Sequence, residues 1–266
     1  MTDGFNKLSI GYNEIYLQGK DTGRGLITQV DYIGIFFYNC RAFKKYGKID
    51  FSEFVYNELK LFESSFKDYL TNDVKQKQED YAKRSAEIFA EIVPHGDNGV
   101  VLNFNYTNPN LPNSFKQINV HGSLKDKEII IGIDGNDASK EFMIPFTKTY
   151  RKLLVTSNLP VLASNYDEII IFGHSLGGQD YSYFQSIFDY VDLYHGKTKI
   201  SFIYSDYFID KNQTTPLQRK TEVADSLFAL MNNYGQTLDN KDHGKNLLHK
   251  LLLEGRIELS LKNFGK

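Results

Sequence analysis

Two short apolar segments, each followed directly by polar side chains, constrain the fold of this chain more than any other feature of its sequence. Val100–Leu102 follows a turn-forming stretch and leads into Asn105. After a loop rich in proline and asparagine, Gln117–Val120 leads into His121. Short apolar runs bounded by turn residues are typical of buried strands. The sequence therefore predicts two neighbouring strands that place Asn105 and His121 at the same carboxyl edge.

This edge gives both polar residues a possible role in ligand binding. In open α/β sheets, ligands bind in the crevice at the carboxyl ends of the strands. Each residue also has a simpler structural interpretation, in which Asn105 caps a turn and His121 is a hydrogen-bonded histidine of the core. The sequence leaves both interpretations open.

Composition narrows the class of protein. The 266 residues suit one large domain or a domain with a helical insertion, and 41% apolar residues is ordinary for a globular chain. A net charge of -2 provides no general basic field, so we expect no general binding to nucleic acid or to anionic membranes. The single cysteine, Cys40, excludes an intrachain disulfide and a multi-cysteine zinc site. The sequence shows no secretion signal and no membrane-spanning apolar run, so we expect a cytoplasmic protein. We also expect no bound metal.

The order of the predicted elements indicates an α/β fold with helices at both ends. Helices are expected over residues 26–46, 50–70, 72–92, 142–155, 181–188, 217–234 and 245–253. Strands are expected over residues 100–102, 117–120, 128–133, 168–172, 199–204 and 257–261, with 168–172 the most clearly buried. We therefore divide the chain into an N-terminal segment with a helical lobe (1–98) and an α/β core with C-terminal helices (99–266).

The sharpest motif follows the strand expected at 168–172. Residues 173–177 read GHSLG and satisfy the G-x-S-x-G pattern of the α/β-hydrolase nucleophile elbow, with Ser175 as the nucleophile. The downstream acid and base would come from Asp206, Asp210, His243 and His249. However, a hydrolase sheet needs several strands before its elbow, and most of the chain before residue 94 has a helical pattern. A serine hydrolase is therefore the less favoured interpretation.

The same turn can instead be a ligand-binding loop. Gly173, Gly177 and Gly178 allow close approach of the backbone, and the amides at the start of the following helix favour an anion such as phosphate. Ser175 would then hydrogen-bond a ribose or a phosphate, and Asp180 would accept hydrogen bonds from a ribose. Asp180 could equally be an acidic residue that stabilises the helix N-terminus.

Taken in order, these elements resemble known families. A strand followed by NFNYT (103–107), a strand followed by HGS (121–123) and a strand followed by Gly-x-Ser-Leu (173–176) resemble the sirtuin-like (SIR2-like) NAD-binding fold. More specifically, NFNYT, VHGS, IIGID and IFGHSLGGQDYSYF together resemble the AbiH family of phage abortive-infection proteins, from about residue 99 to 206 and more loosely to EGRI at 254–257. The resemblance implies a Rossmann-like, mostly parallel sheet and an antiphage function.

The resemblance also implies roles for individual residues. Asn105 matches the sirtuin asparagine beside the nicotinamide ribose, and His121 matches the histidine that acts as a base on a ribose hydroxyl. Ser175 matches a serine that contacts the cofactor, and Asn103 would join it in holding the nucleotide. The implied activity is hydrolysis of NAD⁺ to nicotinamide and ADP-ribose, and the alternative is a non-catalytic nucleotide-sensing module. The implied macromolecular partners are a phage protein that acts as trigger and further copies of the chain.

The chain departs from the two families at identifiable positions. AbiH-like proteins begin with an apolar strand and Gly-Asn-Gly-Phe-Asp, whereas here Asp3-Gly4-Phe5-Asn6 follows almost directly after Met1. We therefore expect the first strand and its phosphate loop to be missing from this sequence. Thr107 occupies the place of the sirtuin aspartate that holds nicotinamide, and the zinc-binding cysteine module is absent. The resemblance therefore does not extend to protein deacylation.

Overall fold

The computed structural model describes residues 51–93, 98–126, 128–135, 138, 141–155, 162, 165–205 and 215–264. The helix expected over 26–46 and the segment around Asp3–Asn6 lie outside the described residues, as do Cys40, Asp206 and Asp210. The chain divides into two compact units, Met1–Leu61 and Phe62–Lys266. The sheets and the candidate site belong to the second unit.

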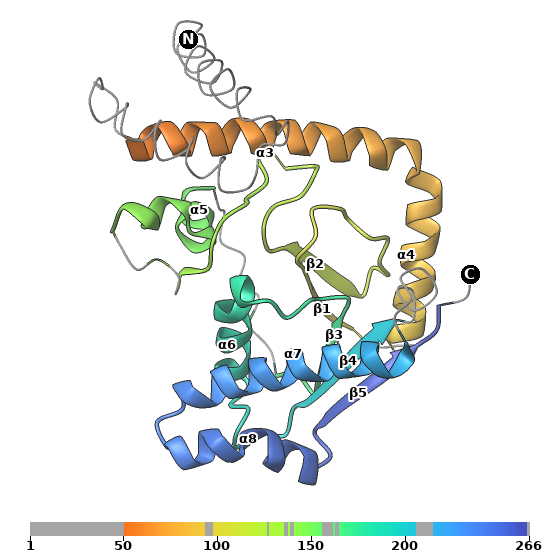
Figure 1. The fold of residues 1–266 in the computed structure, drawn as a ribbon. Coiled ribbons are helices and arrows are strands. Elements are labelled where there is room, and N and C mark those ends of the chain that lie inside the picture. The colour runs from red at the N-terminus through yellow and green to blue at the C-terminus, as the bar shows by residue number, and fades with distance from the viewer. Residues whose placement is uncertain are drawn as a thin grey trace, which may run out of the picture. The chain divides into compact units, whose positions relative to one another are not determined.

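The described elements form a mixed, Rossmann-like α/β fold with helices before and after the strands (Figure 1). In chain order they are α3 (Phe51–Gln76), α4 (Gln78–Ile92), β1 (Gly99–Asn103), β2 (Phe115–Asn119), η2 (Glu141–Phe146), α5 (Lys148–Val155), β3 (Glu168–Phe172), η3 (Gly178–Asp180), α6 (Tyr181–Tyr190), β4 (Lys199–Ser205), α7 (Pro216–Thr237), α8 (Lys241–Leu253) and β5 (Ile257–Lys262). The expected strands are confirmed except that at 128–133. The break between the helices expected over 50–70 and 72–92 comes later, at Lys77.

Every strand pair among the described residues is parallel, in agreement with the predicted mostly parallel, Rossmann-like arrangement. β1 pairs with β2, with Val101 opposite Gln117 and Asn103 opposite Asn119. β3, β4 and β5 form a second sheet in that order. Because β1 and β2 run in the same direction, the polar residues that follow them emerge at one edge, as the sequence indicated.

The most buried strand is β4 and not β3, contrary to the expectation for residues 168–172. Five consecutive residues of β4, from Ile200 to Tyr204, are buried, whereas the isoleucines of β3 are only half-buried and Phe172 is 37% exposed. β4 has a strand on each side, while β3 is paired only with β4 among the described strands. The burial of a strand here therefore depends more on its position within the sheet than on its apolar content.

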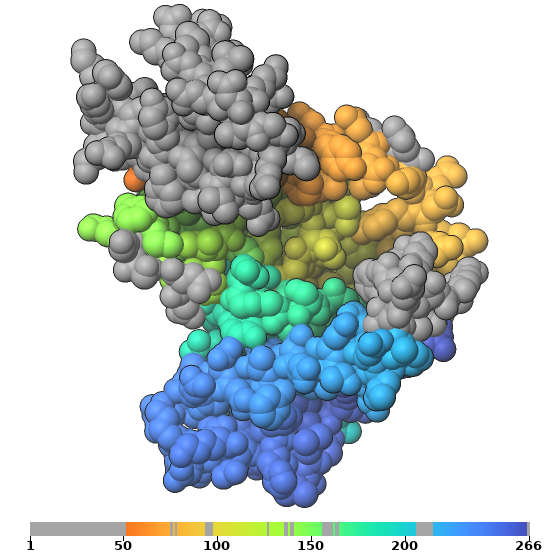
Figure 2. All heavy atoms as spheres, viewed as in Figure 1, coloured from red at the N-terminus to blue at the C-terminus, as the bar shows by residue number. Residues whose placement is uncertain are grey.

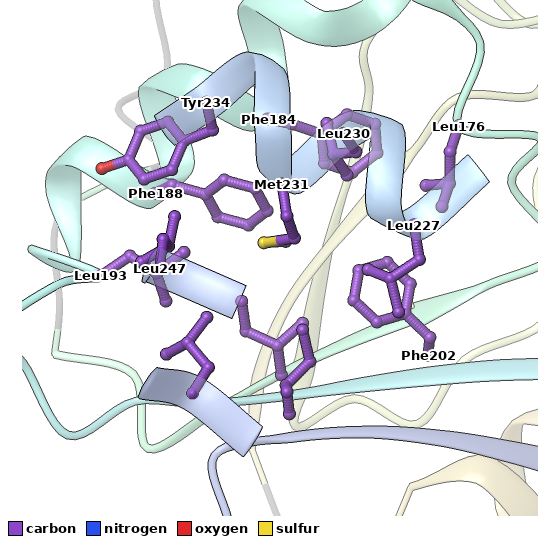
Figure 3. Close-up of a cluster of buried hydrophobic side chains, with 13 residues drawn as sticks. Leu176, Phe184, Phe188, Leu193, Phe202, Leu227, Leu230, Met231, Tyr234 and Leu247 are labelled. Carbon is purple, nitrogen blue, oxygen red and sulfur yellow. The ribbon is translucent and has the colours of Figure 1, made fainter. Parts of the chain in front are cut away.

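The main apolar core lies between α6, α7, α8 and the sheet β3–β5. Side chains at helical spacing supply it, because residues three or four positions apart lie on one face of a helix. The buried set includes Phe184 and Phe188 of α6, Leu227, Leu230, Met231 and Tyr234 of α7, Leu247 and Leu251 of α8, Ile200 and Phe202 of β4, Ile257 of β5, and Leu176 and Leu193 (Figure 3). The space-filling view shows the blue C-terminal helices packed directly against the blue-green segment that contains α6 (Figure 2).

Two glycines allow α7 and α8 to pack at backbone distance. A Cβ atom on Gly235 would collide with the carbonyl oxygen of Gly244, and a Cβ atom on Gly244 would collide with that of Gly235. Both residues are buried. Glycine is required at both positions because no side chain fits between the two backbones.

Replacing Gly244 with alanine should therefore destabilise the protein. We expect the free energy of unfolding to fall by roughly 1–3 kcal/mol, the usual cost of overpacking a well-packed interior. Urea unfolding followed by far-UV circular dichroism measures this. The control is Asn246→Ala on the exposed face of the same helix, which should change stability by less than about 0.5 kcal/mol. Equal effects of the two substitutions would contradict the close packing.

The apolar run at 128–133 does not form the predicted strand. Its backbone groups bond to side chains and to a loop instead of to a neighbouring strand. The Ile131 N–H donates to Glu63 Oε1 at 2.6 Å, the Ile131 carbonyl accepts from Arg151 Nη1 at 2.8 Å, and the Ile130 N–H donates to the His121 carbonyl at 2.9 Å. Only an isolated bridge between Ile133 and Thr147 remains of a strand-like pairing. Buried backbone groups must be bonded, and here side chains satisfy them.

The two side chains that bond Ile131 form a buried ion pair. Glu63 of α3 is 3% exposed and Arg151 of α5 is 1% exposed. Both guanidinium Nη atoms donate to the two carboxylate oxygens, which makes the pair bidentate. Bidentate arginine–carboxylate pairs are among the stronger hydrogen-bonded contacts in proteins. The pair joins α3, the 128–134 segment and α5.

Arg151→Met should be strongly destabilising because it leaves the Glu63 carboxylate buried without its cation. Breaking a buried pair in this way typically costs about 3–5 kcal/mol. We expect the double variant Glu63→Met/Arg151→Met to be more stable than Arg151→Met alone in urea unfolding, because no charge is then stranded. The control is Lys245→Met, which removes an exposed ion pair with Asp242 and should change stability by about 0–1 kcal/mol. A double variant less stable than the single one would contradict this assignment.

Candidate functional site

The carboxyl ends of β2 and β3 bring two predicted site residues into contact. His121 follows β2, and Asp180 closes η3 at the start of α6, 59 positions later in the chain. The imidazole Nε2 of His121 lies 3.0 Å from Asp180 Oδ1. The sequence analysis predicted separate roles for them, a base for His121 and a ribose acceptor for Asp180, and the fold places them in one hydrogen-bonded pair.

Asp180 is the centre of the cluster. Besides His121, its carboxylate lies 2.8 Å from Lys148 Nζ and 3.4 Å from His174 Nε2. Lys148 also donates to the Gln179 carbonyl at 3.2 Å. Asp180 occupies the position that precedes α6, but its side chain makes no capping hydrogen bond to the helix backbone. The structure therefore shows no side-chain cap by Asp180, and the two roles expected from the sequence, ribose acceptor and acidic residue at the helix N-terminus, stay predictions.

The pKa of Asp180 is set by opposing effects. Burial raises the pKa of this carboxyl, but hydrogen bonds from His121, His174 and Lys148, together with the Lys148 charge, outweigh burial and hold it well below its ordinary value. Asp180 is therefore an anion at neutral pH. An anion so placed can fix the orientation of both histidine rings.

His121 is held as a neutral ring with one free lone pair. It is 5% exposed, and burial lowers its pKa below the ordinary value of about 6.5, with the Asp180 hydrogen bond opposing and the charges of Lys148 and Lys152 assisting. With Asp180 anionic, the Nε2 atom carries the proton and donates it. His121 Nδ1 is then the unprotonated nitrogen, and it has no hydrogen-bond partner within the described part of the chain.

The glycine after His121 is required by the backbone. Gly122 has φ +81°, in the left-handed region, and a Cβ atom there would lie 2.6 Å from the Glu128 carbonyl oxygen. The His-Gly pair is thus a turn in which only glycine fits. This turn directs the His121 side chain toward Asp180.

Aromatic rings enclose the pair. Phe104 follows β1, and its ring makes T-shaped contacts with the rings of His121 and His174 at centroid distances of 5.7 and 4.8 Å. Phe104 also stacks on Phe184 at 5.9 Å, and Tyr183 packs against His121 at 5.5 Å. Burial raises the pKa of Tyr183 to about 12, so this phenol stays protonated. The apolar surroundings strengthen every charge interaction in the cluster.

The turn that follows β3 positions His174. Gly173 and Leu176 both have positive φ, +66° and +57°, and the Leu176 N–H donates to His174 Nδ1 at 2.9 Å. This bond leaves His174 Nε2 to face Asp180. Gly177 is in an extended conformation and Gly178 begins η3 with open space on its Cα.

This geometry does not assemble a serine-hydrolase triad from the described residues. Ser175 is exposed, and the positive φ values fall on its neighbours and not on Ser175 itself. His243 stacks on Tyr194 at 4.3 Å, and His249 is an exposed residue of α8. No described hydrogen bond joins Ser175 to a histidine or a carboxylate, while Asp206 and Asp210 lie outside the described range.

Asn103 at the end of β1 and Asn105 just after it differ in burial and in hydrogen bonding. Asn103 is buried, and its side chain holds the following turn by donating to the Thr107 carbonyl at 2.6 Å and accepting from the Asn105 N–H at 3.0 Å. Asn105 is exposed, and its carbonyl accepts from Asn119 Nδ2 at 3.0 Å. No described hydrogen bond links the Asn105 side chain to His121. Asn105 therefore lies at the predicted edge, and its side-chain amide makes no hydrogen bond with the described residues.

Two charged residues of α5 were not predicted to lie at the site. Lys148 bonds Asp180, and Lys152, one turn later, donates to the Asn119 carbonyl at 3.3 Å. Burial lowers the pKa of Lys152. Their spacing of four residues places both on one face of a helix, but nothing in the sequence indicated that this face meets the strand edge. His174 was visible only as the variable position of the GHSLG motif.

The described residues contain no cluster of three or more His, Cys, Asp or Glu side chains that could hold a metal ion. Within the same part of the chain, none of the helices is both long enough and apolar enough to span a bilayer.

Comparison with known proteins assigns the chain to a family. Its residues 28–204 match the family model described as bacteriophage abortive infection AbiH, a range that includes Lys148, His121, His174 and Asp180. No curated protein and no solved structure matches the chain. Because the matched range covers more than half of the 266 residues, the chain belongs to the AbiH family of bacteriophage abortive infection proteins.

Proposed function

We propose that this AbiH protein acts in phage defence by binding NAD⁺ at the edge formed by β1, β2 and the turn after β3, and by hydrolysing it to nicotinamide and ADP-ribose. The observation that carries the proposal is the His121–Asp180 pair. Its carboxylate binds one imidazole nitrogen at 3.0 Å, and the other nitrogen has no partner among the described residues. A neutral histidine held in this way is suited to accept a proton.

The proposed reaction breaks the bond between the ribose C1′ and the nicotinamide nitrogen. The bonding electrons leave with nicotinamide, which departs as a neutral molecule, and positive charge develops at C1′. Water then attacks C1′ and loses a proton to His121 Nδ1. Asp180 stabilises the imidazolium that forms, because its carboxylate already contacts Nε2. The exposed Asn105 amide would orient the ribose or the water.

The charges around the site suit an anionic ligand. Lys148 and Lys152 lie on one face of α5, and the Gly177 and Gly178 amides precede α6. Lys148 contacts Asp180, and Lys152 lies one turn later at the same strand edge, so this face of α5 contributes two positive charges. Such a field attracts the phosphates of a dinucleotide.

A second function has one specific observation in its favour. His121 Nδ1 is fully buried, and Asn105 makes no described contact with His121. A ligand therefore reaches this nitrogen only if the residues that surround His121 move. This favours a nucleotide sensor in which bound ligand changes the position of these segments without turnover.

Measuring nicotinamide release from NAD⁺ by the purified protein distinguishes the two functions. We expect His121→Ala to reduce release by about 10²–10⁴-fold, the usual contribution of a general base. Asp180→Asn should reduce release as well, because the charge that stabilises the imidazolium is lost. The matched control is His195→Ala, which removes a histidine whose side chain is 69% exposed and should leave release unchanged.

Each other outcome has a defined meaning. NAD⁺ binding without release, unaffected by His121→Ala, would support the sensor. Release that survives both His121→Ala and Asp180→Asn would show that the reaction takes place elsewhere.

The pH dependence follows from the lowered pKa of His121. A base with a depressed pKa remains unprotonated below its ordinary pKa of about 6.5, so the acid limb of nicotinamide release should lie below that pH. By the same linkage, the folded state binds this proton less readily than the unfolded chain, so stability is present above about pH 6.5 and falls as the pH drops below it.

Lys152→Met tests one contribution to the lowered pKa of His121, the charge of Lys152, which adds to the larger effect of burial. Removing this positive charge should raise the pKa of His121 and move the acid limb to higher pH, whereas Lys199→Met at the exposed start of β4 should not. NMR titration of the His121 ring reports the same pKa whether or not the protein turns over NAD⁺. A His121 pKa above 6.5 in the wild-type protein would contradict the assignment.

A further inference from the structure

A cavity of about 380 Å³ lies beside the start of α6, on the side of η3 that α7 faces. Gly178 of η3 lines it, and two residues further on in the same short turn Asp180 contacts His121. Small-molecule sites span about 300–1,000 Å³. The cavity is therefore at the lower end of that range, which suits one nucleoside and not a whole dinucleotide.

The floor of the cavity is apolar and fixed in place. Leu230 and Tyr234 line it, and both are members of the buried core between α6, α7 and α8 (Figure 3). Tyr181, at the first position of α6, adds a half-buried aromatic ring. Flat apolar surfaces of this kind accept a planar heterocycle at low cost in side-chain entropy.

The polar groups of the cavity match a base and a sugar. Gln185 of α6 and Asn233 of α7 contribute carboxamides that make no hydrogen bond with any described residue. Carboxamides pair with the adjacent donor and acceptor of an adenine-type edge. Asp134 is 3% exposed and its carboxylate is held by the Ser182 amide at 3.2 Å and by the Ser182 hydroxyl. A carboxylate fixed in this way accepts hydrogen bonds from sugar hydroxyls.

The charge of the cavity excludes a phosphate as its occupant. Its described lining holds one carboxylate and no lysine or arginine. The cations nearby, Lys148 and Lys152, belong to the His121 side of η3. A dinucleotide whose phosphates lie over the turn amides would thus place one nucleoside at His121 and the other in this cavity.

We propose that the cavity binds the purine ribonucleoside half of the dinucleotide, with Gln185 and Asn233 reading the base and Asp134 binding the ribose hydroxyls. The proposal rests on the NAD⁺ site proposed above and adds to it the subsite for adenosine. It concerns binding alone, so free adenosine is a sufficient probe.

The experiment is titration calorimetry of the full chain with adenosine, and with nicotinamide mononucleotide as the opposite half of the ligand. We expect the double variant Gln185→Ala/Asn233→Ala to weaken adenosine binding at least tenfold and to leave nicotinamide mononucleotide binding unchanged. The matched control is Asn232→Ala, an exposed amide next to Asn233 in α7 that does not line the cavity. His121→Ala should leave adenosine binding unchanged.

The results separate the subsite from the activity. Adenosine binding that is undetectable at millimolar concentration, or that the double variant does not weaken, would overturn the subsite. If adenosine binding depends on Gln185 and Asn233 while NAD⁺ is not hydrolysed, the subsite stands and the hydrolase function fails. If hydrolysis depends on His121 but the double variant leaves the KM for NAD⁺ unchanged, the activity stands and the subsite fails.

Discussion

The buried ion pair between Glu63 and Arg151 is the interaction on which the geometry of the candidate site depends. Arg151 is in α5, and its bidentate contact with Glu63 holds that helix against the backbone of Ile131. The same helix carries Lys148 to Asp180, three residues before Arg151. A charge buried to this extent is tolerated only with its partner in place. The position of Lys148, and with it the charge balance of the site, therefore follows from an interaction outside the site.

The charges around Asp180 determine the protonation state of His121. The Asp180 carboxylate accepts hydrogen bonds from Lys148, His121 and His174, and these donors keep it ionised although it is largely buried. The Lys148 charge also opposes protonation of His121, which remains neutral with Nε2 as donor. Burial, an anion and a nearby cation together define which nitrogen can accept a proton. This is the property that a base acting at neutral pH requires, and the proposed hydrolysis of NAD⁺ depends on it.

The short turn η3 joins the two halves of the proposed ligand site. Asp180 ends the turn on the His121 side, while Gly178 begins it on the side of the cavity. Because Asp180 is only two positions after Gly178, a movement of this turn would affect both environments together. In the proposed site, a proton-accepting histidine lies on one side of the turn and a cavity lined by two carboxamides and one carboxylate lies on the other, which matches a dinucleotide with two unlike nucleosides.

Local patterns in the sequence predicted most of the elements and the neighbouring of β1 and β2, but not the contacts between segments far apart in the chain. Apolar runs bounded by turn residues identified β1, β2, β3, β4 and β5, and helical spacing identified α6, α7 and α8, because these signals arise from neighbours along the chain. The run at 128–133 has the same signal and is not a strand, since Glu63, 68 positions away from Ile131, bonds its backbone. Likewise β4 and not β3 is the most buried strand, because pairing on both sides decides burial.

In the candidate site, too, the sequence predicted local features and the tertiary structure determined the long-range contacts. The sequence by itself determined that Asn105, His121 and the turn at 173–178 follow the carboxyl ends of strands, and its motifs indicated the AbiH family. Only the tertiary structure decided that Asp180 binds His121 and makes no capping hydrogen bond to α6, that Lys148 joins them, and that His121 Nδ1 has no hydrogen-bond partner among the described residues. The physical reason is that hydrogen bonds and pKa values depend on which side chains meet in space, and His121 and Asp180 meet across 59 positions of the chain.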